Sequence, residues 1–249
     1  MNGLRIKDSK IRQFGWIPYW NLMPLRQEFM RHWGAQVQLR EGHPSEVNQW
    51  LAEGMVEMAP CSAALLLKNP HVEMAMPLGV ASKGPVKSVY LAIPKSLNGL
   101  SKELAPRMKA LSELAKLGQQ KYGDQVRAVA KFIMGGLNHL PQVEVSPPPM
   151  ALSCASASGA MLSRLFYATM FGEDAYAERC LDGRLATTKK INCQTTAIEL
   201  HIGDDALIRR SQFCEIIDLS SWWYEVFELP FVFAIWQTKS DQVHSLTQV

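Results

Sequence analysis

Two short polar segments of the chain could place neutral hydrogen-bond donors against a small molecule. Pro18–Asn21 contains Tyr19 and Asn21, and the amide of Asn21 offers two donors and an acceptor to a ligand. Ser82–Val89 contains Ser82, Gly84 and Ser88, where glycine permits close approach of the backbone to a ligand. Asn21 could instead close an Asx turn on its own backbone, and Ser82–Val89 could be an ordinary turn.

A third polar segment, Ser153–Gly159, precedes a predicted helix and contains Ser156 and Ser158. Hydroxyls and free backbone N–H groups at the start of a helix favour binding of an anion. Simple capping of the helix by one serine would account for the same residues. Together the three segments indicate recognition of an anionic molecule by neutral donors.

The sequence has no evident acid–base or nucleophilic machinery. Its six histidines are scattered, and no metal-binding spacing, phosphate-binding loop or nucleophile motif is present. The five cysteines include no C-x-x-C pair, which favours reduced thiols that mostly pack in the core of a cytosolic protein. We therefore predict neither a metal site nor a cofactor.

Composition excludes several classes of protein. The chain has 249 residues, 47% of them hydrophobic, and its net charge of +3 comes from interspersed basic and acidic residues. A nucleic-acid binder would show a concentrated basic stripe, and the sequence has none. The sequence has neither a signal-peptide core nor a run of about 18 apolar residues, so we expect a cytoplasmic protein with no membrane span. A small-molecule ligand is the expected partner, and the oligomeric state stays open.

Periodicity predicts alternating strands and helices. In the first part, strands at 11–17, 37–39 and 56–60 alternate with helical segments at 25–33, 44–53 and 62–67. This β-α-β-α-β order predicts a largely parallel sheet, with the loops at Pro18–Asn21 and Pro60–Ser62 at the same edge. Further along, we predict strands at 88–93, 197–202 and 230–236, a strand followed by three prolines within 143–150, and helices at 101–122, 125–137, 156–171 and 205–210.

The three polar segments occur in this order in one known family. The sequence resembles the chorismate dehydratases of menaquinone biosynthesis by the futalosine route, over roughly 11–95 and 150–237. The matching segments are Ile17–Asn21, Glu46–Pro60 with Ser62, Ser82–Val89, Ser156–Ser158, Ile202–Leu207 and Leu229–Trp236. Of these, GPVKSV and LPFVFAIW are quite specific.

The resemblance implies an α/β fold of the two-lobed, periplasmic-binding-protein-like type II class, with the ligand cleft between the lobes. We expect lobe 1 to comprise residues 1–90 plus 197–249, and lobe 2 to comprise residues 91–196. Lobe 2 includes a helical insertion at 98–142, where family members have a short connection. We expect its helices to pack outside that lobe, in place of helices that follow Trp236 in the family.

The resemblance also implies a reaction, the loss of water from chorismate to give 3-[(1-carboxyvinyl)oxy]benzoate, with a substrate carboxylate taking the proton. By the family match, Asn21 and Ser88 assist the elimination. The substrate-binding residues would be Tyr19, Ser62, Ser82, Gly84, Ser156 and Ser158. Two alternatives remain: a non-catalytic cytosolic binding protein or sensor for a small carboxylate, and an interaction module using the 98–142 helices.

Overall fold

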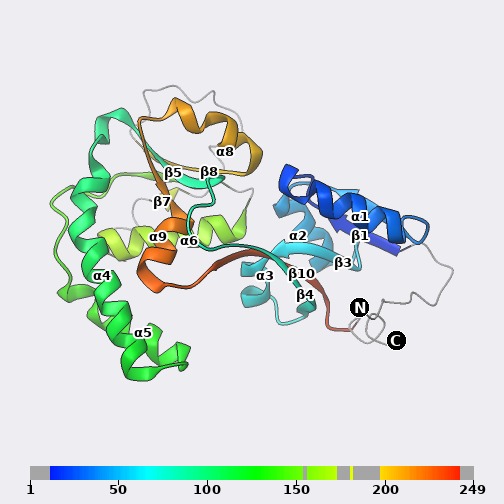
Figure 1. The fold of residues 1–249 in the computed structure, drawn as a ribbon, viewed down its shortest axis with the longest axis horizontal. Helices are drawn as coiled ribbons and strands as arrows, with labels where there is room; N and C mark the ends of the chain where they lie inside the picture. Colours follow the sequence, from blue (N-terminus) through cyan, green and yellow to red (C-terminus); the bar gives the residue numbers. More distant parts are fainter. Residues whose placement is uncertain (1–11, 154–155, 173–179, 182–196, 242–249) are drawn as a thin grey trace. The chain divides into compact units, whose positions relative to one another are not determined.

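A computed structural model describes residues 12–153, 156–172, 180–181 and 197–241 (Figure 1). The chain divides into two compact units. Unit 1 comprises Met1–Ala81, Ala155–Ser158 and Val232–Val249, and unit 2 comprises Ser82–Cys154 and Gly159–Phe231. Each unit contains a five-stranded sheet with helices, so the α/β class predicted from the sequence is confirmed.

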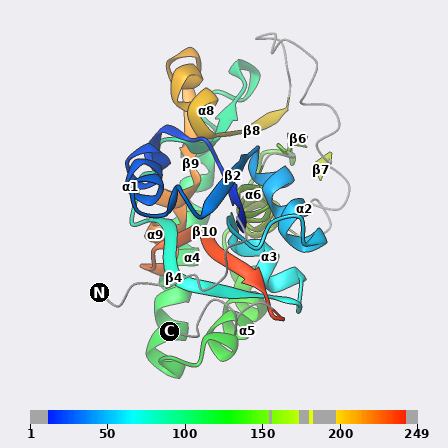
Figure 2. The same ribbon diagram turned by 90° about the vertical axis from the view of Figure 1, so that its right-hand side faces the viewer.

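The sheet of unit 1 has the strand order β2-β1-β3-β10-β4. Figure 2 shows three of its strands, β2, β10 and β4. β1 pairs in parallel with β2 and β3, as predicted, whereas β10 runs antiparallel to β3. The strands are β1 Arg12–Trp16, β2 Val37–Glu41, β3 Met58–Ser62, β4 Val72–Ser82 and β10 Phe231–Lys239. The helices are the short 3-10 helix η1 Trp20–Leu22, α1 Met23–Trp33, α2 Pro44–Glu53 and α3 Ala63–Lys68.

Close packing in unit 1 fixes where its strands end. Trp16 and Trp236 are both buried, and their rings meet edge to face with centroids 5.7 Å apart. At Gly15 a Cβ atom would lie 2.8 Å from the Cβ of Ala59 and 3.0 Å from a methyl carbon of Val47. Only glycine therefore lets β1 lie this close to its neighbours, and the loop that carries Asn21 follows directly.

The sheet of unit 2 has the strand order β7-β6-β8-β5-β9. β5 is antiparallel to both β8 and β9, and β6 is parallel to β7 and β8. The strands are β5 Val89–Ile93, β6 Met150–Ala151, β7 Cys180–Leu181, β8 Ile198–Ile202 and β9 Glu215–Asp218. The helices are η2 Lys95–Leu97, α4 Leu100–Tyr122, α5 Val126–Gly136, η3 Leu137–His139, α6 Ala157–Phe171, α8 Gly203–Arg209, η4 Arg210–Gln212 and α9 Leu219–Phe227.

Three expectations from the sequence differ from this architecture. The strand predicted before the prolines within 143–150 was wrong, because the strand there, Met150–Ala151, comes after the prolines. Strand β4 was not predicted. The two units also divide the chain differently from the expected lobes: residues 82–90 and 197–231 lie in unit 2, because β8 pairs with β5 through Val89–Ala92.

The helices predicted at 101–122 and 125–137 are present as α4 and α5, and Figure 1 shows them in green. α4 packs on α9. The hydroxyl of Ser112 donates to the carbonyl of Glu225 (2.8 Å), and the amide of Gln119 donates to the carbonyl of Phe227 (2.8 Å). α4 is therefore bonded into unit 2 through α9.

Arg107 anchors α4 from inside the protein. Its side chain is buried, and burial lowers the pKa of its guanidinium. The guanidinium donates to the backbone carbonyls of Leu137, Leu140, Pro141 and Thr169 at 2.7–3.4 Å. A single side chain thus links α4 to the end of α5 and to α6, with carbonyl dipoles around its charge.

Replacing Arg107 by Met should lower the free energy of unfolding by roughly 2–4 kcal/mol, because four carbonyls would lose a charged donor. Arg127→Met is the matched control: Arg127 is exposed on α5, and its replacement should change stability by less than about 0.5 kcal/mol. Urea denaturation of both variants measures the difference. Equal effects would show that Arg107 does not anchor α4.

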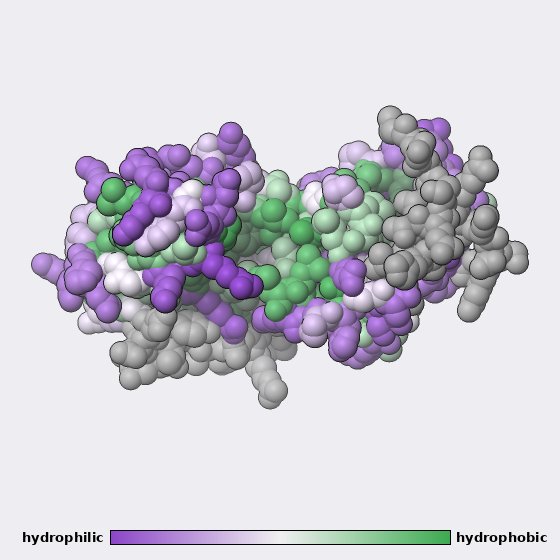
Figure 3. Space-filling view, turned by 90° about the horizontal axis from the view of Figure 1, so that it is seen from below, coloured by the Kyte–Doolittle hydropathy of each residue, from purple (hydrophilic) through white to green (hydrophobic). Residues whose placement is uncertain are grey.

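No helix in the described part of the chain is long and apolar enough to cross a membrane. Apolar side chains nonetheless reach the surface, and Figure 3 shows green apolar patches among polar residues. On unit 1 the exposed apolar residues include Met74 and Leu78 of β4 and Val232 of β10. Scattered apolar residues of this kind are normal on protein surfaces.

Candidate functional site

In unit 1, Tyr19 and Asn21 lie where β1 gives way to the 3-10 helix η1. The N–H of Leu22 donates to the carbonyl of Tyr19 (2.9 Å), which turns the chain directly after the strand. Asn21 is exposed, and its side chain makes no hydrogen bond to any residue that the structure describes. The alternative of an Asx turn at Asn21 is therefore not formed, and its amide is free to bind a ligand.

Ser62 and Ser158 come from segments 96 residues apart and meet in the interior of unit 1. Their hydroxyl oxygens lie 2.6 Å apart, and Ser158 Oγ also lies 2.7 Å from the carbonyl oxygen of Phe233. The N–H of Ala64 donates to Ser158 Oγ at 3.4 Å. The side chains of Ser62 and Ser158 are 4% and 0% exposed.

The direction of these hydrogen bonds follows from the number of protons. A carbonyl only accepts, so Ser158 must give its single hydroxyl proton to Phe233. Ser62 must then donate to Ser158. Both protons are used inside unit 1, so in this arrangement the pair could receive hydrogen bonds from a ligand but could not donate to a carboxylate.

Ser158→Ala should lower the free energy of unfolding by roughly 1–3 kcal/mol, because the Phe233 carbonyl and the Ser62 hydroxyl would lose their partner in the interior. Ser163→Ala in the same helix is the control. Ser163 is equally buried, but among the described residues it donates only to the carbonyl of Gly159, one helical turn earlier, so we expect a loss below about 1 kcal/mol. Denaturation curves that coincide for the two variants would contradict this account.

Ser156 lies just before α6 and is partly exposed. It belongs to unit 1 together with Tyr19, Asn21, Ser62 and Ser158, whereas Ser82, Gly84 and Ser88 belong to unit 2. Of the predicted site residues, the structure brings Ser62 and Ser158 into direct contact. The family resemblance also leads us to expect that Asn21, Ser62, Ser88 and Ser158 converge on one cleft, and this convergence stays a prediction.

In unit 2 the segment Ser82–Ser88 is a tight loop between β4 and β5. The hydroxyl of Ser82 donates to the carbonyl of Gly84 (3.0 Å), as an ordinary turn would require. Gly84 has a φ of 93°, and a Cβ built on it would meet nothing within 4 Å. Positive φ favours glycine here, and the open space beside it leaves room for another molecule. The hydroxyl of Ser88 has no hydrogen-bond partner among the described residues.

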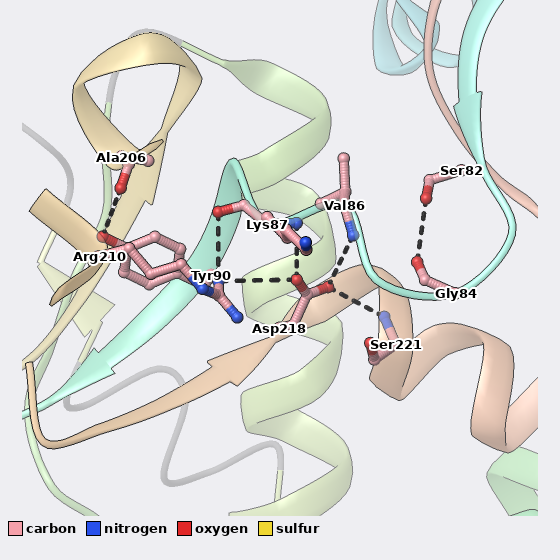
Figure 4. A network of polar contacts seen from close by, with 9 residues as sticks. All are labelled: Ser82, Gly84, Val86, Lys87, Tyr90, Ala206, Arg210, Asp218 and Ser221. Atoms are coloured by element: carbon pink, nitrogen blue, oxygen red, sulfur yellow. Dashed lines mark hydrogen bonds and ion pairs between the residues drawn. The ribbon is translucent and has the colours of Figure 1, made fainter. Parts of the chain in front are cut away.

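A carboxylate that the sequence did not single out holds this loop. Figure 4 shows Asp218, at the end of β9, receiving hydrogen bonds from the backbone N–H groups of Val86 (3.3 Å), Lys87 (2.8 Å) and Ser221 (3.1 Å). Arg210 lies 3.8 Å from the same carboxylate and donates to the carbonyl of Lys87 (3.2 Å). The sequence signal for Asp218 was only that of a helix cap, Asp-Leu-Ser-Ser.

Beside this network, Tyr90 and His201 form part of the interior of unit 2. Tyr90 donates its hydroxyl to the carbonyl of Ala206 (2.9 Å), and burial raises its pKa to about 12. His201 stacks on Tyr90 with ring centroids 5.5 Å apart. Both rings are buried and also pack against the ring of Phe213, so His201 has a structural role in unit 2.

The cysteines of the described residues differ from one another. Cys61 is buried, and burial raises the pKa of its thiol far above the ordinary value, as expected of a packing residue. Cys214 is exposed, so the expectation of packing does not hold there. No group of three or more His, Cys, Asp or Glu side chains in the described part of the chain is placed to hold a metal ion. Cys154 and Cys193 lie outside the described residues.

Comparison with known proteins assigns the family. The model of the menaquinone biosynthesis family matches residues 13–130 and 137–249, so the chain belongs to that family. A search of curated proteins found no match.

Solved structures resemble the chain at low sequence identity. A protein of Archaeoglobus fulgidus is 11% identical, with a TM-score of 0.52 over 92% of this chain and 68% of that protein. A protein of Bordetella bronchiseptica RB50 is also 11% identical, with a TM-score of 0.54 over 94% of this chain and 65% of its own length. The periplasmic aliphatic sulphonate binding protein SsuA of Escherichia coli is 10% identical over 95% of this chain and 64% of its own, with a TM-score of 0.47. The chain therefore spans about two thirds of the length of these proteins, and the first two likenesses show a shared fold.

Proposed function

We propose that this chain is a chorismate dehydratase of menaquinone biosynthesis, which converts chorismate to 3-[(1-carboxyvinyl)oxy]benzoate and water. The observation that carries the proposal is the family match over 13–130 and 137–249. The motif residues Asn21 and Ser88 support it, because their polar side chains have no partner among the described residues.

The chemistry suits a site built from neutral donors. Chorismate loses a ring proton and hydroxide from adjacent carbons, and the ring becomes aromatic, so the product is strongly favoured. The carbon that loses its proton is conjugated to the ring carboxylate, and negative charge that develops there can be stabilised by hydrogen bonds to that carboxylate. The substrate's second carboxylate takes the proton, and hydroxide leaves with it as water. The protein then has to orient the substrate and to place donors.

The described residues divide into those that hold the fold and those that remain available. The hydroxyls of Ser62, Ser158 and Ser82 donate within the protein. Asn21 and Ser88 are free to donate to groups that gain charge during the elimination. We infer that these two side chains act on the same substrate molecule. Tyr19, Gly84 and Ser156 would bind it, with Gly84 allowing its close approach.

Asn21→Ala should lower kcat on chorismate by about 100-fold with little loss of stability, because it removes a donor matched to developing charge. Ser88→Ala should have a similar effect. Asn138→Ala is the control, since Asn138 is also exposed and also occupies the middle of a three-residue 3-10 helix, η3. Steady-state kinetics with detection of the aromatic product measures all three. If Asn21→Ala and Asn138→Ala were equally active, Asn21 would have no role in the reaction.

Ser156→Ala should act mainly on KM, with kcat changed less than threefold or so. Its proposed partner is a substrate carboxylate, which is charged both before and after the reaction. Kinetics over a range of chorismate concentrations separates the two parameters. A fall in kcat at unchanged KM would assign Ser156 to the chemical step and contradict this role. Wild-type protein that binds chorismate and releases no product would instead be a carboxylate-binding protein.

A further inference from the structure

Asp218 uses both of its carboxylate oxygens on backbone N–H groups. One oxygen, Oδ1, accepts from Ser221 in the first turn of α9 and from Val86. The other, Oδ2, accepts from Lys87. The Asp218 side chain is only 8% exposed, and Arg210 is the basic side chain that the structure places near it, 3.8 Å from Oδ2.

Capping of α9 explains only part of this arrangement. A helix cap needs one side-chain oxygen, and Asn or Ser would serve as well as Asp. The second oxygen serves a segment 131 residues earlier in the chain, at Lys87. Two successive N–H groups directed at one carboxylate form the kind of concave site that binds anions elsewhere. Here the protein supplies the anion itself.

The loop that Asp218 holds is strained at Lys87. Lys87 has a φ of 63°, a left-handed conformation that residues other than glycine seldom adopt. The bond from its N–H to Asp218 (2.8 Å) and the bond from Arg210 to its carbonyl (3.2 Å) hold it on both sides. Ser88, the next residue, has its carbonyl bonded to the N–H of Gly203 (2.9 Å). The orientation of the Ser88 side chain therefore depends on how Lys87 is held.

We propose that Asp218 is a positioning residue: its carboxylate clamps the backbone of Val86 and Lys87 and so fixes the loop that presents Gly84 and Ser88 to the substrate. The catalytic consequence rests on the proposed function, whereas the clamp itself can be measured without substrate. Figure 4 shows the clamp with Arg210 on one side and the start of α9 on the other.

The test is Asp218→Asn, which separates the two roles of the side chain. Asn keeps an oxygen for the cap of α9, but it replaces one carboxylate oxygen by an NH₂ group, which cannot accept from Lys87. Loss of a hydrogen bond to a charged group changes the equilibrium constant for opening of that bond by about tenfold or more. We therefore expect hydrogen exchange at the Lys87 amide to rise about tenfold, whereas the Val86 amide keeps its bond to the remaining oxygen, and we expect kcat on chorismate to fall about tenfold.

Glu215→Gln is the matched control on the same strand. Glu215 also accepts from two backbone N–H groups, those of Gly99 (2.5 Å) and Ser101 (2.6 Å), at the start of α4. Gln keeps one oxygen, so the replacement should raise exchange at Gly99 or at Ser101, while exchange at Lys87 and the value of kcat stay unchanged. A general loss of stability would affect both variants alike, and thermal melts of each show its extent.

Combination with Ser88→Ala tests whether Asp218 acts through Ser88. If it does, kcat of the double variant Asp218→Asn with Ser88→Ala should be no lower than that of Ser88→Ala alone, because the loop then has no catalytic hydroxyl left to position. Losses that multiply, or unchanged exchange at Lys87 in Asp218→Asn, would overturn the proposal. If wild-type protein does not convert chorismate, the proposed function fails, and the exchange measurement alone decides whether Asp218 clamps the loop.

Discussion

The hydroxyl of Ser158 is the point at which the three separate stretches of unit 1 are joined. It lies in the short segment Ala155–Ser158, accepts from Ser62 at the end of β3, and donates to Phe233 in β10. β10 is also held to the same place by Gln237, whose amide donates to the carbonyls of Cys61 and Ser62 at 3.0 and 2.9 Å. Because β10 completes the sheet beside β3, the loops at the ends of the parallel strands depend on this junction.

In unit 2, a charged side chain joins stretches that are separate in the sequence. Its chain is also discontinuous, and the Asp218 carboxylate joins β9, the start of α9 and the loop before β5. In both units, polar groups without solvent must be paired, so the buried hydroxyls and carboxylates are used to hold the fold. Exposed Asn21 and half-buried Ser88 are exempt from that requirement, and this leaves them available for a ligand.

Local patterns predicted much of the fold. Apolar spacing located the helices α1, α2, α4, α5 and α6, and alternation of strand and helix predicted the parallel pairing of β1 with β2 and β3. The sequence did not predict features that depend on contacts between residues far apart in the chain. Residues 143–146 have the composition of a strand but find no neighbouring strand, and the partner of Asp218 lies more than 130 residues away. Likewise, no spacing in the sequence indicates that the hydroxyls of Ser62 and Ser158 donate hydrogen bonds to other groups of the protein.

The central claim is that a protein without an evident general base aromatises chorismate by placing neutral donors. One incubation of the wild-type protein with chorismate, followed by proton NMR, tests it most directly. The account predicts that the ring signals of chorismate disappear and that one molecule of 3-[(1-carboxyvinyl)oxy]benzoate, with its four aromatic protons and intact vinyl group, appears for each molecule consumed. Chorismate that decays only as fast as it does in buffer alone would contradict the claim.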